Sequence, residues 1–225
     1  LDSGNQAYPG LMVSDFRKSI NGQTYFFAES GAMRYGWVQS SEGWYFAGTS
    51  GAMQTGWVLQ GNTWYYLDAD NQSYPGLMIS SSKRAINGQT YFFTNSGSMQ
   101  TGWVSYPEGW YYANPDGAMK TGWIQLGRTW YYLDGNNQTY PGLMVANCQK
   151  QIGGLTYYFN SDGSMRTGWY KENSAWYYYD DTSGQIATGW KFVGGYWYYL
   201  DNSGKMATGW LKLNGYWYYL SPSGA

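Results

Sequence analysis

The sequence predicts an all-β fold, a repeat solenoid of stacked β-hairpins. Three observations support this prediction. Aromatic residues make up 21% of the 225 residues and charged residues only 12%, a bias typical of repeat arrays rather than of ordinary globular domains. A Gly-Trp dipeptide recurs along the chain, and a second Trp follows seven residues after the first. The segment Tyr-Pro-Gly-Leu-Met recurs every 66 residues, at Tyr8, Tyr74 and Tyr140.

The short repeat consists of two Trp residues separated by a polar or glycine-containing stretch. Aromatic runs on both sides of such a turn predict a β-hairpin. Because an isolated hairpin is barely stable in water, we expect each hairpin to stack on its neighbours. The pairs are Trp37/Trp44, Trp57/Trp64, Trp103/Trp110, Trp123/Trp130, Trp169/Trp176, Trp190/Trp197 and Trp210/Trp217.

Each 66-residue period also contains a variant hairpin, in which Leu replaces the first Trp and Thr the second. Leu77 and Thr90 are 13 residues apart instead of 7. Six additional residues preserve the alternation of side chains, so we expect residues 81–86 to lengthen the hairpin beyond the stack. One module of about ten hairpins, three of them long, is therefore predicted for residues 1–225. The hairpins are expected to begin near residues 11, 37, 57, 77, 103, 123, 143, 169, 190 and 210.

Several functional classes are excluded by composition. The net charge of −1 offers no basic surface for nucleic acid or anionic membranes, and no apolar run is long enough for a spanning helix. The chain has no His and one cysteine, Cys148. A Ser-His-Asp or Cys-His nucleophile and a structural zinc site therefore cannot be built. We expect a binding module with no catalysis, no cofactor and no metal.

The aromatic residues themselves indicate what could be bound. Alternation along a strand places Trp57, Trp64 and Tyr66 on one face of a hairpin and Tyr65 on the other. We expect the aromatic ring at the third position of the next hairpin to close a cage with the two Trp. Three interpretations remain open at this point: a structural aromatic core, a platform for sugar rings, or a cage for a quaternary ammonium ion, which donates no hydrogen bonds.

Residues 188–190, 196–201 and 204–210 closely resemble the choline-binding repeats of streptococcal, especially pneumococcal, surface proteins. The resemblance implies that choline sits between consecutive hairpins, held by two Trp of the first and a Tyr of the next. It also implies a secreted module at the bacterial cell surface that binds phosphocholine of teichoic acids non-covalently. A module that begins mid-repeat is expected to be a fragment of a longer protein, and a wall hydrolase is the expected parent. A glucan-binding repeat and a structural spacer are the alternatives.

Six choline cages are predicted on this basis. The three variant hairpins lack both Trp walls, so the cage that each would form with its successor is expected to be empty. A recurring Met before Gly-Trp is expected to fill space between hairpins or to form the floor of a cage. The predicted walls are Trp37, Trp44 and Tyr66; Trp57, Trp64 and Phe92; Trp103, Trp110 and Tyr132; Trp123, Trp130 and Tyr158; Trp169, Trp176 and Tyr199; and Trp190, Trp197 and Tyr219.

Overall fold

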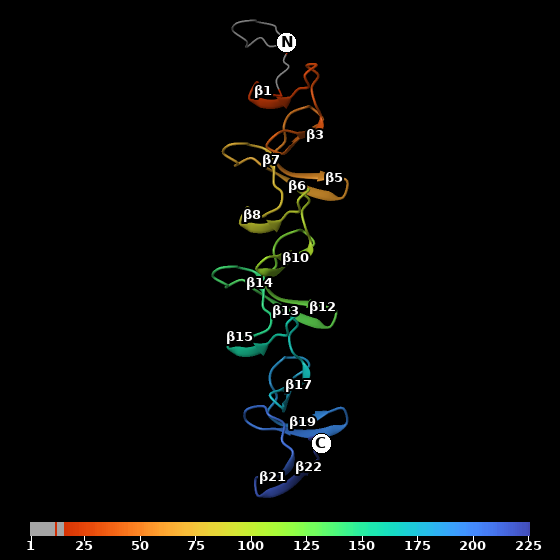
Figure 1. Ribbon diagram of the computed structural model, residues 1–225, viewed down its shortest axis with the longest axis vertical. Helices are drawn as coiled ribbons and strands as arrows, with labels where there is room; N and C mark the ends of the chain where they lie inside the picture. The colour runs from red at the N-terminus through yellow and green to blue at the C-terminus, as the bar shows by residue number, and fades with distance from the viewer. Residues whose placement is uncertain (1–11, 13–15) are drawn as a thin grey trace. The chain divides into compact units, whose positions relative to one another are not determined.

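The computed structural model describes residue 12 and residues 16–225. Within these residues every regular element is a β-strand, and the strands form ten hairpins, which confirms the predicted all-β repeat fold (Figure 1). The predicted start near Leu11 lies outside the described residues. The hairpins are β1 (Arg17–Ile20) with β2 (Gln23–Phe26), β3 (Gly36–Gln39) with β4 (Trp44–Ala47), β5 (Gly56–Gln60) with β6 (Thr63–Asp68), β8 (Lys83–Ile86) with β9 (Gln89–Phe92), β10 (Gly102–Tyr106) with β11 (Gly109–Ala113), β12 (Gly122–Leu126) with β13 (Thr129–Asp134), β15 (Gln149–Ile152) with β16 (Leu155–Tyr158), β17 (Gly168–Glu172) with β18 (Ala175–Tyr179), β19 (Gly189–Val193) with β20 (Tyr196–Leu200), and β21 (Gly209–Leu213) with β22 (Tyr216–Leu220).

Tight two-residue turns close most of these hairpins. In β8–β9, Ile86 pairs with Gln89, so Asn87 and Gly88 alone form the turn. Both have positive φ, 50° and 79°. This conformation matches the right-handed twist of the flanking strands, and Asn and Gly adopt it at low cost. The turn sequence therefore sets the register of the aromatic residues on each hairpin.

The variant repeats are not long hairpins, which corrects the starts predicted near residues 77 and 143. Two short strands, β7 (Leu77–Met78) and β14 (Leu143–Met144), instead pair with β6 and β13 and convert these hairpins into three-stranded sheets. Hairpins β8–β9 and β15–β16 begin only at Lys83 and Gln149. Within residues 81–86, Lys83–Ile86 thus form an ordinary first strand, and the six residues do not lengthen the hairpin.

A Pro-Gly turn causes this difference. The amide of Leu77 donates to the carbonyl of Tyr74 at 3.0 Å, across Pro75 and Gly76, and Gly76 has φ +82°. Pro at the second position and Gly at the third favour a turn that reverses the chain. The reversal returns the chain to the edge of β6, where Leu77 pairs with Asp68.

Two compact units make up the chain, and the division passes through the β10–β11 hairpin. Unit 1 comprises Leu1–Val104 and Tyr112–Met119, and unit 2 comprises Ser105–Tyr111 and Lys120–Ala225. Each unit has a core of aromatic and aliphatic side chains rather than one large aliphatic centre. In unit 1, Phe26, Val38, Tyr45 and Ala47 form one buried cluster, and in unit 2 Val145, Phe159 and Met165 form another.

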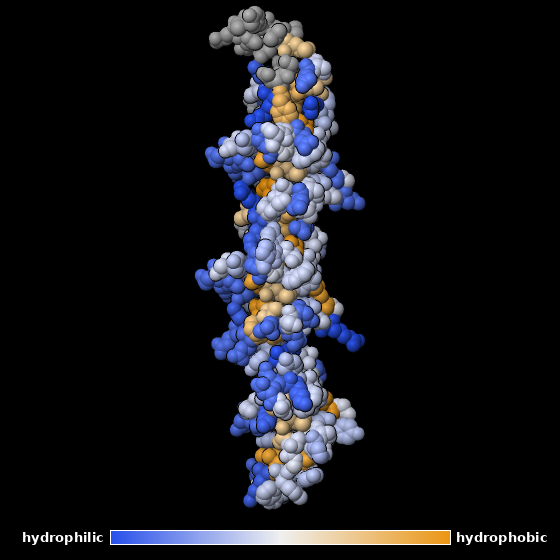
Figure 2. All heavy atoms as spheres, viewed as in Figure 1, coloured by the Kyte–Doolittle hydropathy of each residue, from blue (hydrophilic) through white to orange (hydrophobic). Residues whose placement is uncertain are grey.

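Methionine side chains join successive turns within each unit. A Cβ added at Gly117 would overlap the sulfur of Met99, and one added at Gly184 would overlap that of Met165. Both glycines have positive φ, 84° and 67°, so glycine is favoured there on two grounds. The recurring Met therefore does pack between hairpins, as one of the two interpretations predicted. On the face shown in Figure 2, residues of high hydropathy appear only in small areas between neutral and hydrophilic residues.

Two features are absent from the described residues. Within residues 16–225, no helix is long and apolar enough to cross a membrane. The same part of the chain contains no group of three or more His, Cys, Asp or Glu residues placed to hold a metal ion.

Candidate functional site: aromatic cages between hairpins

Each cage starts from two Trp side chains on one face of a hairpin. In β5–β6, Trp57 pairs with Tyr66 and Leu59 pairs with Trp64, which places both indoles on the same face. Their rings are 6.3 Å apart at an angle of 90°. Four further pairs within single units repeat this arrangement. Their distances and angles are 6.5 Å and 88° for Trp37 and Trp44, 6.1 Å and 89° for Trp123 and Trp130, 6.4 Å and 90° for Trp169 and Trp176, and 6.3 Å and 89° for Trp210 and Trp217.

Where another hairpin follows in the same unit, one of its tyrosines lies against the first Trp of the pair. The ring of Tyr91 is 4.8 Å from that of Trp57, inclined at 67°. Two indoles at right angles and one phenol thus form three walls around a common space. The other ring distances are 4.8 Å for Trp37 and Tyr65, 4.7 Å for Trp123 and Tyr157, 4.6 Å for Trp169 and Tyr198, and 5.1 Å for Trp190 and Tyr218.

The third ring is therefore one residue earlier in the chain than the ring predicted from the sequence. Phe92 is fully buried, and Tyr158 contacts Tyr179 at 5.1 Å. The other predicted rings in single units lie against the Trp of their own hairpin, at 5.1 Å for Tyr66, 5.0 Å for Tyr132, 5.3 Å for Tyr199 and 5.2 Å for Tyr219.

The physical reason for this correction is the geometry of a stack. A hairpin has two faces, and it meets its predecessor with one and its successor with the other. Since the Trp face is directed toward the successor, the successor must present its opposite face to those Trp. Residues that share a face with the Trp, such as Tyr66, therefore cannot close the previous cage, whereas Tyr65 can.

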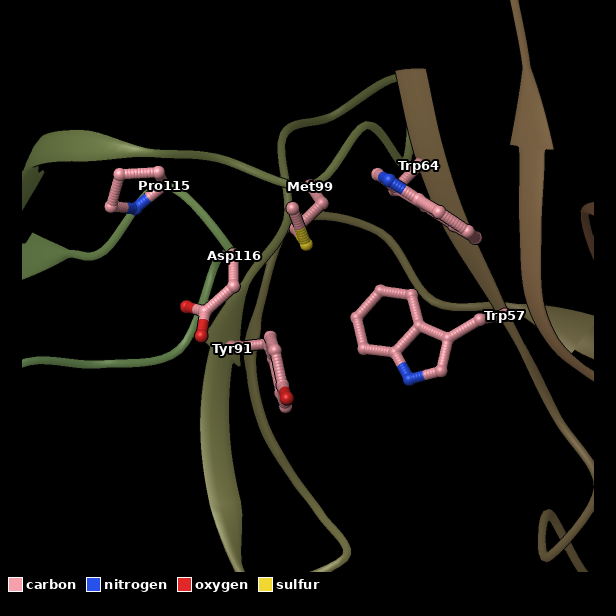
Figure 3. Close-up of a pocket in the computed structure, with 6 residues that line it drawn as sticks. All are labelled: Trp57, Trp64, Tyr91, Met99, Pro115 and Asp116. Carbon is pink, nitrogen blue, oxygen red and sulfur yellow. The ribbon is translucent and has the colours of Figure 1, made fainter. Parts of the chain in front are cut away.

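Two cavities mark where a ligand could fit. One, of about 330 Å³, is lined by Trp57, Trp64, Tyr91, Met99, Pro115 and Asp116 (Figure 3). The other, of about 270 Å³, is lined by Trp123, Trp130, Tyr157, Met165, Thr182 and Ser183. Both are near the lower end of the usual size of small-molecule pockets, about 300–1,000 Å³. We call them the Asp116 cage and the Ser183 cage.

Both cavities include residues that come from two hairpins further along the chain. The amide of Met99 donates to the carbonyl of Trp64 at 2.8 Å, and Met165 does the same to Trp130. The methionine side chains thus line the cages as well as packing on the turns, which agrees with both interpretations of the recurring Met. Pro115, Asp116, Thr182 and Ser183 were missed, because nothing in the spacing of the Trp pairs indicates that a third hairpin contributes.

Two of the six predicted cages differ from this description. Trp103 lies in unit 1, whereas Trp110 and Tyr132 lie in unit 2, so their grouping stays a prediction. In β19–β20 the ring of Trp197 lies 5.2 Å from Phe192, and 56% of Trp197 is exposed. That cage is more open than the four whose Trp rings meet at right angles.

Models of two repeat families match most of the chain. A family model described as a choline-binding repeat matches residues 17–53, 81–116, 148–188 and 187–225. A second, described as a putative cell wall binding repeat, matches residues 55–70 and 121–136. No curated protein sequence matches the chain significantly.

Solved structures of Streptococcus pneumoniae proteins share the fold. CbpJ is 28% identical with a TM-score of 0.62, and the alignment covers 93% of this chain and 92% of CbpJ. CbpF is 26% identical with a TM-score of 0.62, with 93% and 91% covered. The choline-binding domain of CbpL is 30% identical with a TM-score of 0.58, with 85% and 96% covered. Since the choline-binding repeat model also matches more than half of the residues, this chain belongs to the family of choline-binding repeat proteins.

Proposed function

We propose that this module attaches to the bacterial cell wall non-covalently by holding the choline groups of teichoic acids, presented as phosphocholine, in the cages between its hairpins. The observation that carries the proposal is the repeated set of two perpendicular indoles and one phenol around an open cavity. The residues proposed to bind choline are the Trp pairs of the six cages predicted from the sequence. In five of these cages the third wall is Tyr65, Tyr91, Tyr157, Tyr198 or Tyr218.

The chemistry of the walls suits a quaternary ammonium ion. The face of an aromatic ring is the negative end of its quadrupole, and each cation contact contributes about 0.5–2 kcal/mol. Trimethylammonium donates no hydrogen bonds, so it loses nothing when oxygen ligands are absent. Its methyl groups fit an apolar lining such as Met99, which lies between Asp116 and Trp64 in Figure 3.

Several weak sites on one chain suit a repetitive ligand. Each cage offers a few contacts, so the affinity for a single choline is expected to be low. A wall polymer carries many choline groups, and linked sites raise the apparent affinity by about 10²–10⁴. The module is thus proposed to act as a secreted anchor without catalysis of its own, and a wall hydrolase is the proposed effector in the parent protein.

Retention on a resin that carries tertiary amines, followed by release with free choline, tests this proposal. The matched control is a dextran column, since a glucan-binding repeat would be retained there instead. A crystal soaked in choline should show the ligand against Trp57, Trp64 and Tyr91. Ligand bound elsewhere, or retention only on dextran, would contradict the proposal.

Choline should also raise the thermal unfolding midpoint. It contacts two or three hairpins in the folded chain and has no such site in the unfolded chain, so binding shifts the equilibrium by mass action. An unchanged midpoint at saturating choline would count against cages that bridge hairpins.

A further inference from the structure

We propose that Asp116 makes the Asp116 cage selective for choline over phosphocholine, whereas the Ser183 cage accepts both. The two cages would then recognise different parts of a wall polymer: one the bare cationic head group with its phosphate directed away, the other the head group together with its phosphate. This inference rests on the proposed function and specifies the ligand of the same sites.

The first step of the argument is that Asp116 belongs to the cavity and is held there. Asp116 lines the cavity opposite the Trp pair, beside Pro115 and Tyr91 (Figure 3). Its Oδ1 atom accepts a hydrogen bond from the amide of Ala118 at 3.0 Å. A carboxylate has two oxygens that accept several hydrogen bonds, so this single bond positions the group without neutralising its charge.

The turn that carries Asp116 is rigid. Pro115 has a restricted φ, and the amide of Gly117 donates to the carbonyl of Asn114 at 2.8 Å. Gly117 in turn lies under Met99, which also lines the cavity. These contacts fix the turn, and they hold the exposed Asp116 side chain beside the cage.

The second cage has a hydroxyl group at the structurally equivalent position. Ser183 immediately precedes Gly184, as Asp116 precedes Gly117, and Met165 packs on Gly184 as Met99 packs on Gly117. Ser183 Oγ accepts a hydrogen bond from the amide of Gln185 at 3.3 Å, which repeats the bond from Ala118 to Asp116. Thr182 and Ser183 line that cavity, whose lining contains no charged residue.

This difference acts on the phosphate end of the ligand. A carboxylate beside the cavity repels a nearby phosphate, whereas the hydroxyl of Thr182 can donate to a phosphate oxygen. The Ser183 hydroxyl donates to Asp180 Oδ1 at 3.1 Å, and the charge of Asp180 is paired with Lys191. Exposed charge pairs change an equilibrium by about two- to fivefold. Attraction of the ammonium ion strengthens both ligands equally and cancels in the ratio of choline to phosphocholine affinity, whereas repulsion of the phosphate weakens phosphocholine alone. Because the phosphate carries a charge of about −1.5 to −2 at neutral pH, we expect this ratio to be about fivefold higher in the Asp116 cage.

Fluorine NMR of protein labelled with 5-fluorotryptophan measures the two cages separately. The signals of Trp64 and Trp130 are assigned from the Trp64→Phe and Trp130→Phe variants and followed during titration with choline and with phosphocholine. Asp116→Asn removes the charge and keeps an acceptor for Ala118. Asp116→Ser gives the first cage the side chain that the second has at the equivalent position.

In both variants, the affinity ratio reported by the Trp64 signal should fall about fivefold, to the value reported by Trp130, while the Trp130 signal stays unchanged. An unchanged ratio at Trp64 would overturn the role of Asp116, with the proposed function intact as long as both signals respond to choline. Failure of both signals to respond to choline in the unmodified protein would overturn the proposed function and this inference together. Unaltered signals from the other labelled Trp residues verify that each variant is folded.

Discussion

Two regions of the chain build the same cage with different connections. In residues 56–92, a Pro-Gly turn and the strand β7 intervene between the hairpins, and Tyr91 comes 27 residues after Trp64. In residues 168–200 the connection is direct, and Tyr198 comes 22 residues after Trp176. The Trp rings nevertheless meet at 6.3 Å and 90° in the first region and at 6.4 Å and 90° in the second.

The similarity shows what determines the cage. The tyrosine of the next hairpin lies 4.8 Å from the first Trp in one region and 4.6 Å in the other, with an inclination of 67° in both. These distances are set by the register within each hairpin and by the face that each hairpin presents to the next. The length of the connection between two hairpins does not change them. The extra residues of the first region are absorbed by an added strand that leaves the aromatic face in place.

What differs between the regions is burial around the cage. Phe92 and Tyr199 occupy equivalent register positions, opposite Lys83 and Trp190. Phe92 is fully buried, whereas Tyr199 is only partly buried. The carboxylates at the end of the preceding hairpin follow the same trend. Asp68, the last residue of β6, has a side chain that is 8% exposed, whereas Asp180, directly after β18, has one that is 33% exposed.

The largest expected effect therefore comes from Phe92→Ala. Removing a fully buried phenyl ring should lower the free energy of unfolding by about 3–5 kcal/mol. Tyr199→Ala at the equivalent position should cost about 1–2 kcal/mol, because less apolar surface leaves water there. Equilibrium unfolding in urea measures both. Equal losses in the two variants would show that the regions are packed alike.

A second, smaller difference is expected at the ion pairs that link neighbouring hairpins. Arg84 donates to Asp68 at 2.7 Å, and Lys191 donates to Asp180 at 2.8 Å. Arg84→Met leaves a buried carboxylate without its cation and should cost about 1–3 kcal/mol of unfolding free energy. Lys191→Met breaks a more exposed pair and should cost about 0.2–1 kcal/mol. A larger loss in Lys191→Met than in Arg84→Met would contradict the difference in burial.

Acid provides an independent check on the second pair. The hydrogen bond from Lys191, followed by the backbone amide of Ser183, holds the pKa of Asp180 well below its usual value. A depressed folded-state pKa gives stability that is present above the unfolded value, about 4, and is lost as the pH falls through the folded value. Lys191→Met should therefore flatten the loss of stability below pH 4. A melting curve series from pH 7 to pH 2 would detect this.

The sequence predicted the hairpins well, for local reasons. A pair such as Asn87 and Gly88 forms a tight turn in its own right, and alternation assigns Trp57 and Trp64 to one face without knowledge of any neighbour. These features depend on residues close together in the chain. The all-β fold and the clustering of each Trp pair follow from them.

The third wall and the variant repeats depend on contacts between hairpins. Alternation states that Tyr65 and Tyr66 face opposite ways, but only the order of stacking decides which one meets Trp37. The pairing of Leu77 with Asp68 likewise depends on where the Pro-Gly turn returns the chain. The register also shows that Lys83, not Leu77, occupies the first Trp position of β8–β9. The empty cage expected between this hairpin and its successor therefore stays a prediction, with Lys83 in place of Leu77.

The third wall can be tested by comparing the same change in both regions. Tyr91→Ala and Tyr198→Ala each remove one cation contact, so each should weaken choline binding at its own cage about 2- to 30-fold. Because the ring geometry is the same, the two losses should be equal despite the different connections. Tyr91→Phe keeps the ring face and should bind nearly as well as the unmodified protein. Choline titrations followed at Trp64 and Trp176 measure these changes, and unequal losses would show that the connection shapes the cage.

The smallest expected effect concerns Tyr66 and Tyr178, which occupy equivalent positions two residues after the second Trp. Burial raises the pKa of both phenols. Tyr178 also donates a hydrogen bond to Asp181, and its pKa rises to about 12. The bond to Asp181 favours the neutral phenol, so Asp181→Asn should lower the pKa of Tyr178 and leave that of Tyr66 unchanged. A raised folded-state pKa contributes stability below the unfolded value, about 10, and this stability is lost as the pH rises toward 12.

Absorbance at 295 nm follows the titration of the Tyr178 phenol alone when the signal of the Tyr178→Phe variant is subtracted. If Asp181→Asn leaves the midpoint in place, burial alone raises the pKa, and the two regions are equivalent in this respect as well.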